Sequence, residues 1–264
     1  DRKTLRLVAR RTWRFFETFV TPAENMLPPD NFQEDPLPLV AHRTSPTNIG
    51  LYLLSIASAR EFGWLGLSDA VGRIEATLAT ARRMEKYNGH LYNWYETTTL
   101  RPLEPRYVST VDSGNLAGHL IALANYSASW MVEPAKVETS LEGIADALDV
   151  LAKDLSDIPN DRQMLRPIRK QLESQLATLL RATETAREAP EHILVRLIDF
   201  AVQAANIHAP TTTYAAELDT TAGRQLLSWA AALRETVESH IKDASIGPDA
   251  AAGMKKRLEI LIAE

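Results

Sequence analysis

The stretch G-H-L-Y-N-W-Y-E-T-T-T-L-R-P-L-E-P-R-Y-V-S-T-V-D-S-G-N-L-A-G-H, from Gly89 to His119, sets the expectation for the first half of this chain. It joins a long aromatic connection, with two prolines, to the start of an apolar helix. Its aromatic residues are Tyr92, Trp94, Tyr95 and Tyr107. Aromatic rings beside polar groups suit a sugar-binding surface, because rings stack on the C–H faces of sugars, but they equally suit a loop packed into its own core. The stretch alone leaves both interpretations open.

The composition is that of an ordinary globular protein. The chain has 264 residues, of which 45% are hydrophobic and 24% charged, so one or two domains are expected. A net charge of −5 does not indicate a nucleic-acid-binding surface, and the absence of cysteine excludes disulfides and thiol chemistry. No apolar run approaches the roughly 18–20 residues of a membrane span. Because the sequence starts at Asp1 and runs straight into a helix-like pattern, we expect a piece of a longer polypeptide.

Apolar residues that recur every three or four positions predict an all-α fold. In the first half they predict helices over residues 2–20, 46–62, 67–87 and 113–131. The second and fourth are apolar nearly all round, whereas the other two have a single apolar face. Long connections lead into the apolar helices and short turns leave them. This alternation predicts an incomplete alpha/alpha toroid of about four inner and outer helices, because four helices cannot close the ring.

Small polar residues begin each of the two apolar helices. Ser45 precedes Pro46, the pattern of an N-cap followed by proline at the first helical position. Asp112 begins the other helix, and we expect it to cap that helix, or to cap it and also contact a ligand. Free N–H groups and partial positive charge at a helix start favour ligand oxygens. The alternative is a cap with a structural salt bridge.

The second half differs in character. Of the 18 aromatic residues, 15 lie within residues 1–131, so the later part lacks an aromatic surface. It consists of long amphipathic patterns that begin near prolines. These patterns predict helices over 134–156, 160–187, 190–208, 212–243 and 248–262. We expect no strands, and we expect His192, His208 and His240 at the surface or at helix ends. The predicted domains are residues 1–131, the half-toroid, and 132–264, a helical insertion or spacer bundle.

The residues indicate neither a metal site nor a cofactor. His42, His90 and His119 lack the spacing of metal ligands, and neither a phosphate-binding glycine loop nor a nucleophile elbow is present. What remains is a set of carboxylates among aromatic residues: Asp30, Glu34, Asp35, Glu96, Glu104 and Asp112. Glycoside chemistry needs two carboxyl groups that flank the bond, and the sequence does not give their separation.

Four longer motifs resemble the cyclic beta-1,2-glucan synthases. They are P-P-D-N-F-Q-E at 28–34, V-A-H-R-T-S-P-T-N-I-G-L-Y-L-L-S at 40–55, G-H-L-Y-N-W-Y at 89–95 and V-D-S-G-N-L-A-G-H-L-I-A-L at 111–123. The match is to the region between the membrane-embedded glycosyltransferase part and the C-terminal phosphorylase-like part of that family. It covers about residues 1–131. Residues 132–264 resemble the family only as a variable helical stretch.

The resemblance implies a glycoamylase-like toroid related to endo-beta-1,2-glucanases. In that family this region is implicated in cyclising linear beta-1,2-glucan by transglycosylation with retention. The family's soluble parts lie on the cytoplasmic side of the bacterial inner membrane. Because the later portion of the glycoamylase-like region does not appear here, we expect the catalytic glutamates to lie outside this chain, and we assign no catalytic residue. The fragment alone is expected to be inactive, and its parent to be a glycosyltransferase and transglycosylase.

The resemblance also implies the wall of a glucan-binding cleft. Its residues would be His42, Arg43, Thr44, Ser45, Asn48, Tyr92, Asn93, Trp94, Tyr95, Asp112, Ser113 and Asn115. The implied partners are linear and cyclic beta-1,2-glucan and the remaining domains of the same polypeptide, without nucleic acid. Two other hypotheses remain open: a non-catalytic helical scaffold between the transferase and phosphorylase-like parts, and an inverting beta-glucan hydrolase. Exposure of the aromatic residues separates the cleft from the scaffold.

Overall fold

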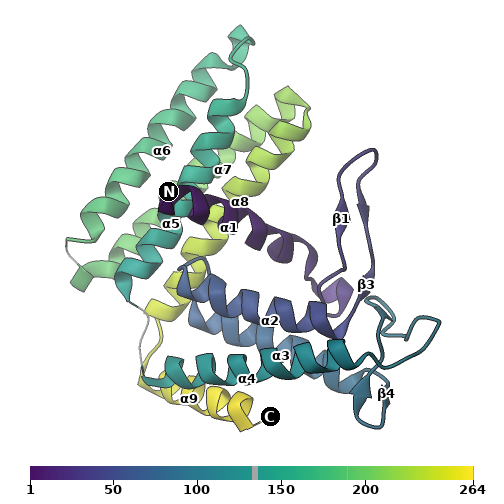
Figure 1. Cartoon of the computed structure of the whole chain (residues 1–264). Coiled ribbons are helices and arrows are strands. Elements are labelled where there is room, and N and C mark those ends of the chain that lie inside the picture. Colours follow the sequence, from purple (N-terminus) through teal and green to yellow (C-terminus); the bar gives the residue numbers. More distant parts are fainter. Residues whose placement is uncertain (133–135, 189, 264) are drawn as a thin grey trace. The chain divides into compact units, whose positions relative to one another are not determined.

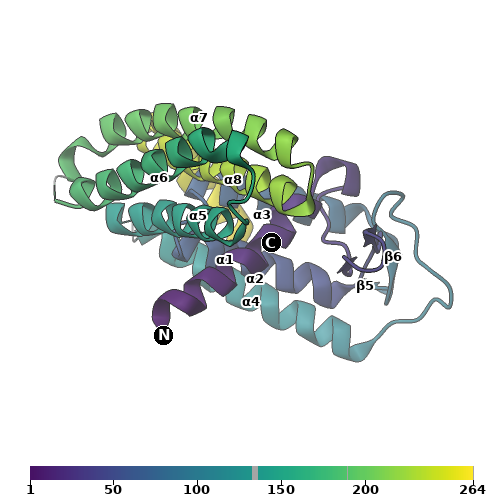
Figure 2. The ribbon, with the colours of Figure 1, turned by 90° about the horizontal axis from the view of Figure 1, so that it is seen from above.

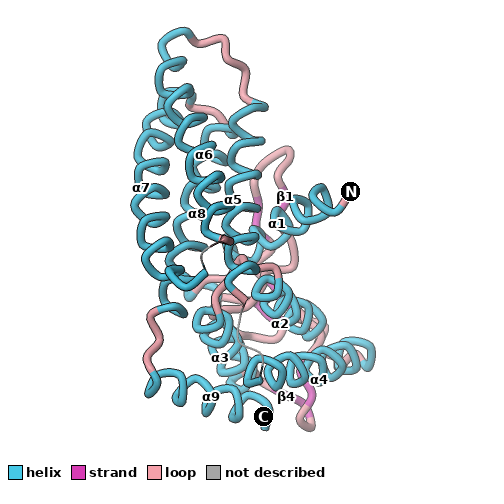
Figure 3. The backbone as a smooth tube through the Cα atoms, turned by 90° about the vertical axis from the view of Figure 1, so that its left-hand side faces the viewer, coloured by secondary structure: helices cyan, strands magenta, loops and turns pink. Residues whose placement is uncertain are grey.

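The computed structural model describes residues 1–132, 136–188 and 190–263. Those residues are predominantly helical, as the tube in Figure 3 shows, so the predicted all-α class is confirmed. The toroid remains a prediction. The first four helices are α1 (Arg2–Phe19), α2 (Pro46–Glu61), α3 (Leu67–Arg83) and α4 (Thr110–Val132). The later ones are α5 (Val137–Asp157), α6 (Arg166–Ala186), α7 (Ile193–Leu218), α8 (Thr221–Ala244) and α9 (Pro248–Ala263).

Short elements lie between the helices. Three 3-10 turns are η1 (Pro22–Glu24), η2 (Gln163–Leu165) and η3 (Pro190–His192). Among the described residues, six two-residue strands form three antiparallel pairs, contrary to the expectation of no strands. They are β1 (Phe32–Gln33), β2 (Leu39–Val40), β3 (Arg43–Thr44), β4 (Lys86–Tyr87), β5 (His90–Leu91) and β6 (Tyr95–Glu96). Two residues are too few to show a period-2 pattern, which is why the sequence did not predict them.

One predicted break between two helices is wrong. The expected break before residue 212 is absent, because Pro210 lies inside α7, which continues to Leu218. A single proline removes one backbone donor, and packing along the rest of a long helix outweighs that loss. The helix ends where Asp219 takes a left-handed φ of 47°, and Thr220 then caps α8 by accepting from the Gly223 N–H at 3.1 Å. The predicted helix start at Pro134 lies outside the described residues.

The chain forms two compact units, each assembled from three segments. Unit 1 comprises Asp1–Arg10, Arg60–Ser68 and Ala135–Pro248. Unit 2 comprises Arg11–Ala59, Asp69–Pro134 and Asp249–Glu264. The predicted division between residues 131 and 132 stays a prediction.

In unit 1 the long helices α5 to α8 lie side by side, as Figures 1 and 2 show. Helix α5 faces the others with one continuous apolar stripe, formed by Leu141, Ile144, Leu148, Leu151 and Leu155. All five are at least 98% buried, and their alternating spacing of three and four residues keeps them on one helical face. The apolar face that the amphipathic pattern predicts for α5 is therefore the face that the bundle buries.

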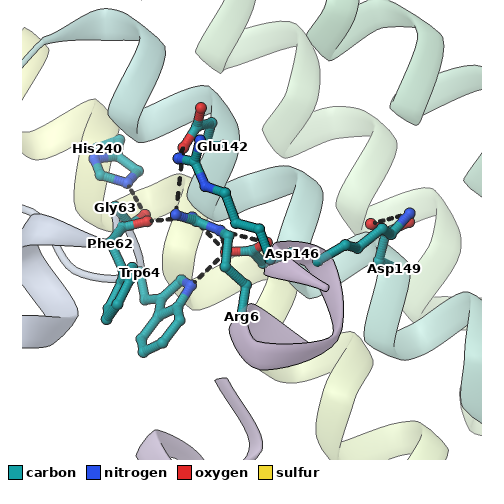
Figure 4. Close-up of polar contacts among 10 residues, drawn as sticks. Arg6, Phe62, Gly63, Trp64, Glu142, Asp146, Asp149 and His240 are labelled. Carbon is teal, nitrogen blue, oxygen red and sulfur yellow. Dashed lines mark hydrogen bonds and ion pairs between the residues drawn. The ribbon is translucent and has the colours of Figure 1, made fainter. Parts of the chain in front are cut away.

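In unit 1, side chains of α8 contact backbone groups of residues 60–68 and hold this segment against the bundle. His240 of α8 lies 2.7 Å from the carbonyl oxygen of Gly63 through its Nε2 atom, as Figure 4 shows. Asp243 accepts the N–H groups of Leu67 and Ser68 at 2.5 and 3.0 Å, and so caps the start of α3. His240 is 95% buried, so of the two expected positions the surface is wrong, and the residue lies near the C-terminal end of α8. Its partner is 177 residues away, which no local pattern reveals.

In unit 2 the core is built around α2. Ile49, Tyr52, Leu53 and Ile56 are fully buried, consistent with a helix that is apolar nearly all round. The Tyr52 ring stacks on Trp13 of α1, with centroids 6.5 Å apart. Burying four large side chains contributes on the order of 6–12 kcal/mol before the entropy of ordering them is subtracted.

A glycine on α2 allows α4 to approach closely. A Cβ at Gly50 would lie 2.3 Å from Nδ1 of His119, whereas a Cβ at Gly72 of α3 would meet nothing within 4 Å. We expect Gly50→Ala to lower the free energy of unfolding by about 1–3 kcal/mol through overpacking. Gly72→Ala should leave it unchanged or raise it by up to about 1 kcal/mol, because alanine favours a helix. Urea unfolding followed by circular dichroism measures both, and equal midpoints would contradict the close approach.

Candidate functional site

In unit 2, the connection that precedes α2 contacts the connection that precedes α4. Strand β3 pairs with β6, so that Thr44 lies opposite Tyr95. At the helix starts, the Thr47 hydroxyl donates to a carboxylate oxygen of Asp112 at 2.5 Å. The two helix entrances that the sequence indicated are therefore directly hydrogen-bonded to each other.

Side chains of the first connection hold it against the second. Asn25 donates from its amide to the carbonyl oxygens of Thr97 and Thr98, at 2.8 and 3.0 Å. One carboxylate oxygen of Glu24 lies 2.9 Å from Nδ1 of His42, and the other accepts from the Thr97 hydroxyl. His42 is thus exposed but already engaged, and its contacts fix the position of the next residue along the chain.

That next residue, Arg43, carries a positive charge between the two connections. Its Nε and Nη2 atoms donate to one oxygen of Asp30 at 3.1 and 2.9 Å, and the other oxygen of Asp30 accepts from the Asn48 amide at 3.3 Å. The guanidinium carbon lies over the Trp94 ring, 4.9 Å from its centroid. A carboxylate therefore orients an arginine against an indole, an arrangement stabilised by the ring's negative face. The Arg43 side chain is 51% exposed.

Asn93 connects this aromatic group to Asp112. Its amide nitrogen donates to Asp112 at 2.9 Å, and its amide oxygen accepts from Trp94 Nε1 at 2.6 Å and from the Tyr107 hydroxyl at 2.8 Å. The Asn115 amide donates to the Thr47 hydroxyl at 3.2 Å. Asp112 lies in the first turn of α4, where the helix dipole favours a negative charge.

Asp112 is not the cap that the sequence led us to expect. Helix α4 starts at Thr110, and the Ser109 hydroxyl accepts the Asp112 N–H at 3.1 Å. The order Ser109-Thr-Val-Asp112 follows the capping-box pattern, which places serine at the cap and the acid three residues later. The prediction for Ser45 is confirmed, because its hydroxyl accepts the Asn48 N–H at 3.1 Å.

Several of the predicted cleft residues are buried. Tyr95 is fully buried, its hydroxyl donates to the Glu85 carbonyl at 2.6 Å and accepts from the Tyr92 N–H at 2.7 Å, and burial raises the pKa of Tyr95 to about 12. Thr44 is also fully buried, and Ser45 is 96% buried. These residues shape the cluster from within. Their place in a ligand-binding set stays a prediction.

The remaining predicted residues differ in exposure. His42, Arg43 and Asn115 are exposed, whereas Asn48, Tyr92, Trp94, Asp112 and Ser113 are partly buried and Asn93 is 94% buried. Sequence reasoning did not place Asp30, Thr47 or Tyr107 in the set, although each contacts one of its members. We call Asp30, Arg43, Asn48, Trp94, Asn93, Asp112, Thr47, Asn115 and Tyr107 the entrance cluster.

The entrance cluster is suited to forming hydrogen bonds with hydroxyl groups. It offers carboxylate acceptors, amide and hydroxyl groups that both donate and accept, and a half-buried indole face. Within the described part of the chain, no group of three or more His, Asp or Glu residues could hold a metal ion. None of the described helices meets the length and hydropathy needed to cross a membrane.

The described residues define the class as an all-helical protein with an aromatic and polar cluster at two helix starts. No family model matches the chain. It is, however, similar to the cyclic beta-(1,2)-glucan synthase NdvB of Rhizobium meliloti (strain 1021), with 46% identity over 258 residues. The alignment covers 97% of this chain but only 9% of the relative, so the chain spans about a tenth of that protein. This similarity confirms the resemblance that the sequence motifs indicated.

Proposed function

We propose that unit 2 supplies one wall of the glucan-binding cleft in the cyclising part of a cyclic beta-1,2-glucan synthase. The observation that carries the proposal is the Arg43–Trp94 pair, held by Asp30 at the start of a helix. The similarity to a named cyclic beta-(1,2)-glucan synthase supports the choice of ligand, which we propose to be a linear or cyclic beta-1,2-glucan.

The chemistry of the cluster matches a glucan. A glucose ring presents C–H groups on its faces and hydroxyls around its edge, so it fits a flat ring bordered by donors and acceptors. Trp94 supplies the flat ring. The carboxylate of Asp30 and the amide of Asn115 lie with it in the entrance cluster, where each can exchange hydrogen bonds with sugar hydroxyls.

In this proposal the chain binds glucan but does not perform the chemical step. Retaining transfer needs a nucleophile and an acid/base about 5–5.5 Å apart. We place those carboxylates in other parts of the polypeptide, whose further helices would complete a toroid begun by residues 1–131. The whole protein would then act as a transferase and transglycosylase at the cytoplasmic side of the bacterial inner membrane.

One observation favours a scaffold as the second candidate. Tyr95 and Thr44 are fully buried, and Asn93 is nearly so, as expected for a loop that packs into its own core. The exposure of Arg43 and the partial exposure of Trp94 favour binding instead. The two candidates predict different effects of removing the Trp94 ring. The cleft predicts weaker glucan binding, and the scaffold predicts unchanged affinity.

We expect Trp94→Ala in the intact synthase to weaken binding of linear beta-1,2-glucan about 10- to 100-fold. This corresponds to losing the roughly 1.5–3 kcal/mol of one buried aromatic surface. Isothermal titration with linear beta-1,2-glucan measures the change. The control is Tyr87→Ala, which removes another aromatic residue of unit 2 that is 59% exposed and outside the entrance cluster.

The Tyr87 variant should bind like the unsubstituted protein. Unchanged affinity of a folded Trp94→Ala protein would reject the cleft and leave the scaffold.

A further inference from the structure

The side-chain amide of Asn93 joins three other members of the entrance cluster. Its oxygen accepts from Trp94 Nε1 at 2.6 Å and from the Tyr107 hydroxyl at 2.8 Å, and its nitrogen donates to Asp112 at 2.9 Å. An amide offers two acceptor positions and two donor hydrogens, so three of the four are already used. Asn93 is also 94% buried. It therefore has little left to offer a sugar hydroxyl, although the sequence motifs placed it in the wall of the cleft.

The three partners require an amide at this position. A carboxylate of the same size could accept from Trp94 and Tyr107, but it could not donate to Asp112 and would place a second negative charge beside it. An apolar side chain would leave three polar groups without this partner. The residue type at position 93 is therefore determined by the groups around it.

The ring of Trp94 is held at its edge and on one face. The bond from Nε1 to Asn93 holds the edge. Arg43 covers the face, with its guanidinium carbon 4.9 Å from the ring centroid, and Asp30 in turn holds Arg43. An aromatic side chain has only a broad preference about its second torsion, so contacts such as these fix the plane of the ring. Because Trp94 is only partly buried, the exposed part of a fixed ring keeps one orientation.

Separate bonds fix the backbone around the ring. The Asn93 N–H donates to the Tyr107 carbonyl oxygen, and the Leu103 N–H donates to the Trp94 carbonyl oxygen, both at 2.9 Å. The next residue, Tyr95, is fully buried. None of these contacts uses the amide of Asn93. Loss of the amide should therefore free the indole ring and leave the connection in place.

We propose that Asn93 is a positioning residue that fixes the plane of the Trp94 ring before a glucan arrives, and that it does not itself contact the glucan. This inference rests on the proposed function, in which Trp94 is the stacking surface. A ring that is already in place loses less conformational freedom when a ligand binds, so the ligand binds more tightly. The alternative is a bond that only stabilises the connection, and the glucan affinity of the folded protein would then not depend on it.

The first measurement needs no glucan. NMR can follow the exchange of the Trp94 indole proton with solvent in the 264-residue chain, which has five tryptophans, and Trp94→Phe assigns the signal by its loss. Asn93→Ala should speed this exchange about fivefold or more, the effect of losing one hydrogen bond. The control is Tyr107→Phe, which removes the other donor to the same amide oxygen and should leave the exchange of the Trp94 proton unchanged.

The second measurement is a double-mutant cycle on the affinity of the intact synthase for linear beta-1,2-glucan. Asn93→Ala should weaken binding about two- to tenfold, the cost of immobilising one side chain on binding. In a Trp94→Ala background the same substitution should change the affinity less than about twofold, because the ring through which it acts is gone. If Asn93→Ala does not fold, Asn93→Ser serves both measurements, since its hydroxyl is one bond too short to reach the indole.

The outcomes separate the positioning role from the proposed function. Unchanged affinity of Trp94→Ala would reject the cleft and, with it, the positioning role. Weaker binding by Trp94→Ala together with full affinity of Asn93→Ala would reject the positioning role alone. Equal losses from Asn93→Ala in the two backgrounds would also reject it, because Asn93 would then contact the glucan directly. Unchanged indole exchange in Asn93→Ala would show that the amide does not hold the ring.

Discussion

Gly143→Ala is expected to unfold unit 1 or to weaken it severely. A Cβ on this α5 residue would lie 1.8 Å from the carbonyl oxygen of Gly63 and 2.1 Å from its carbonyl carbon. The obstacle is backbone, which cannot rotate away as a side chain can. Gly63 is further constrained by a φ of +77° and by the contact of its carbonyl with His240. We expect a loss of more than about 3 kcal/mol, a large share of a typical 5–15 kcal/mol stability.

Urea unfolding followed by circular dichroism measures this effect. The control is Gly253→Ala on α9, where an added Cβ meets nothing within 4 Å. That variant should be neutral or slightly more stable, because alanine favours a helix over glycine. An unfolding midpoint for Gly143→Ala that matches the control would show that α5 and the 60–68 segment do not approach so closely.

Asp146→Ala is expected to produce the second large loss. As Figure 4 shows, this α5 carboxylate receives Arg6 Nη2 at 2.6 Å and Trp64 Nε1 at 2.8 Å. The side chains of Arg6 and Asp146 are only 13% and 10% exposed. Removing one partner leaves a nearly buried cation and an indole N–H without this acceptor, so we expect a loss of about 3 kcal/mol.

The control for this substitution is an ion pair of similar length at the surface. Lys153 and Asp157 are 2.5 Å apart but each 58% exposed, so Asp157→Ala should cost about 0.5 kcal/mol or less. Limited proteolysis adds a structural readout, because the loss at 146 should release residues 1–10 for cleavage. Equal stability of the two variants would contradict the account of unit 1.

These contacts explain why unit 1 is discontinuous in sequence. Asp146 joins α5 to residues 6 and 64, and Asp243 joins α8 to the start of α3. The long-helix bundle thus relies on side chains that precede it by more than 70 residues. A sequence pattern that repeats every few residues contains no information about such pairings.

The helices themselves could be predicted, because their signal is local. The Ser45-Pro46 dipeptide marks the start of α2, and the stripe from Leu141 to Leu155 marks the buried face of α5. The break predicted at Pro210 is absent, because the packing of α7 against its neighbours outweighs the effect of one helix-breaking residue. Propensity is a weak guide where tertiary contacts oppose it.

The candidate site was only partly predictable for the same reason. Residue types and motifs pointed to the two connections that contact each other in unit 2, but they did not say which side chains face inward. Tyr95 is fully buried, whereas the adjacent Trp94 and Glu96 are only partly buried. In extended backbone neighbouring residues point to opposite sides, so a one-residue difference in register exchanges buried and exposed positions. The partners Thr47 and Asp112, which are 65 positions apart, emerge only from the fold.

The most direct test of the central claim is a structure of the intact synthase with linear beta-1,2-glucan bound. The measured quantity is the distance from the Trp94 ring to the nearest glucose unit. We expect a sugar face in contact with that ring, with heavy atoms within about 4–4.5 Å, and hydroxyls bonded to groups of the entrance cluster. Another part of the polypeptide covering Trp94, with the glucan bound elsewhere, would contradict the proposed function.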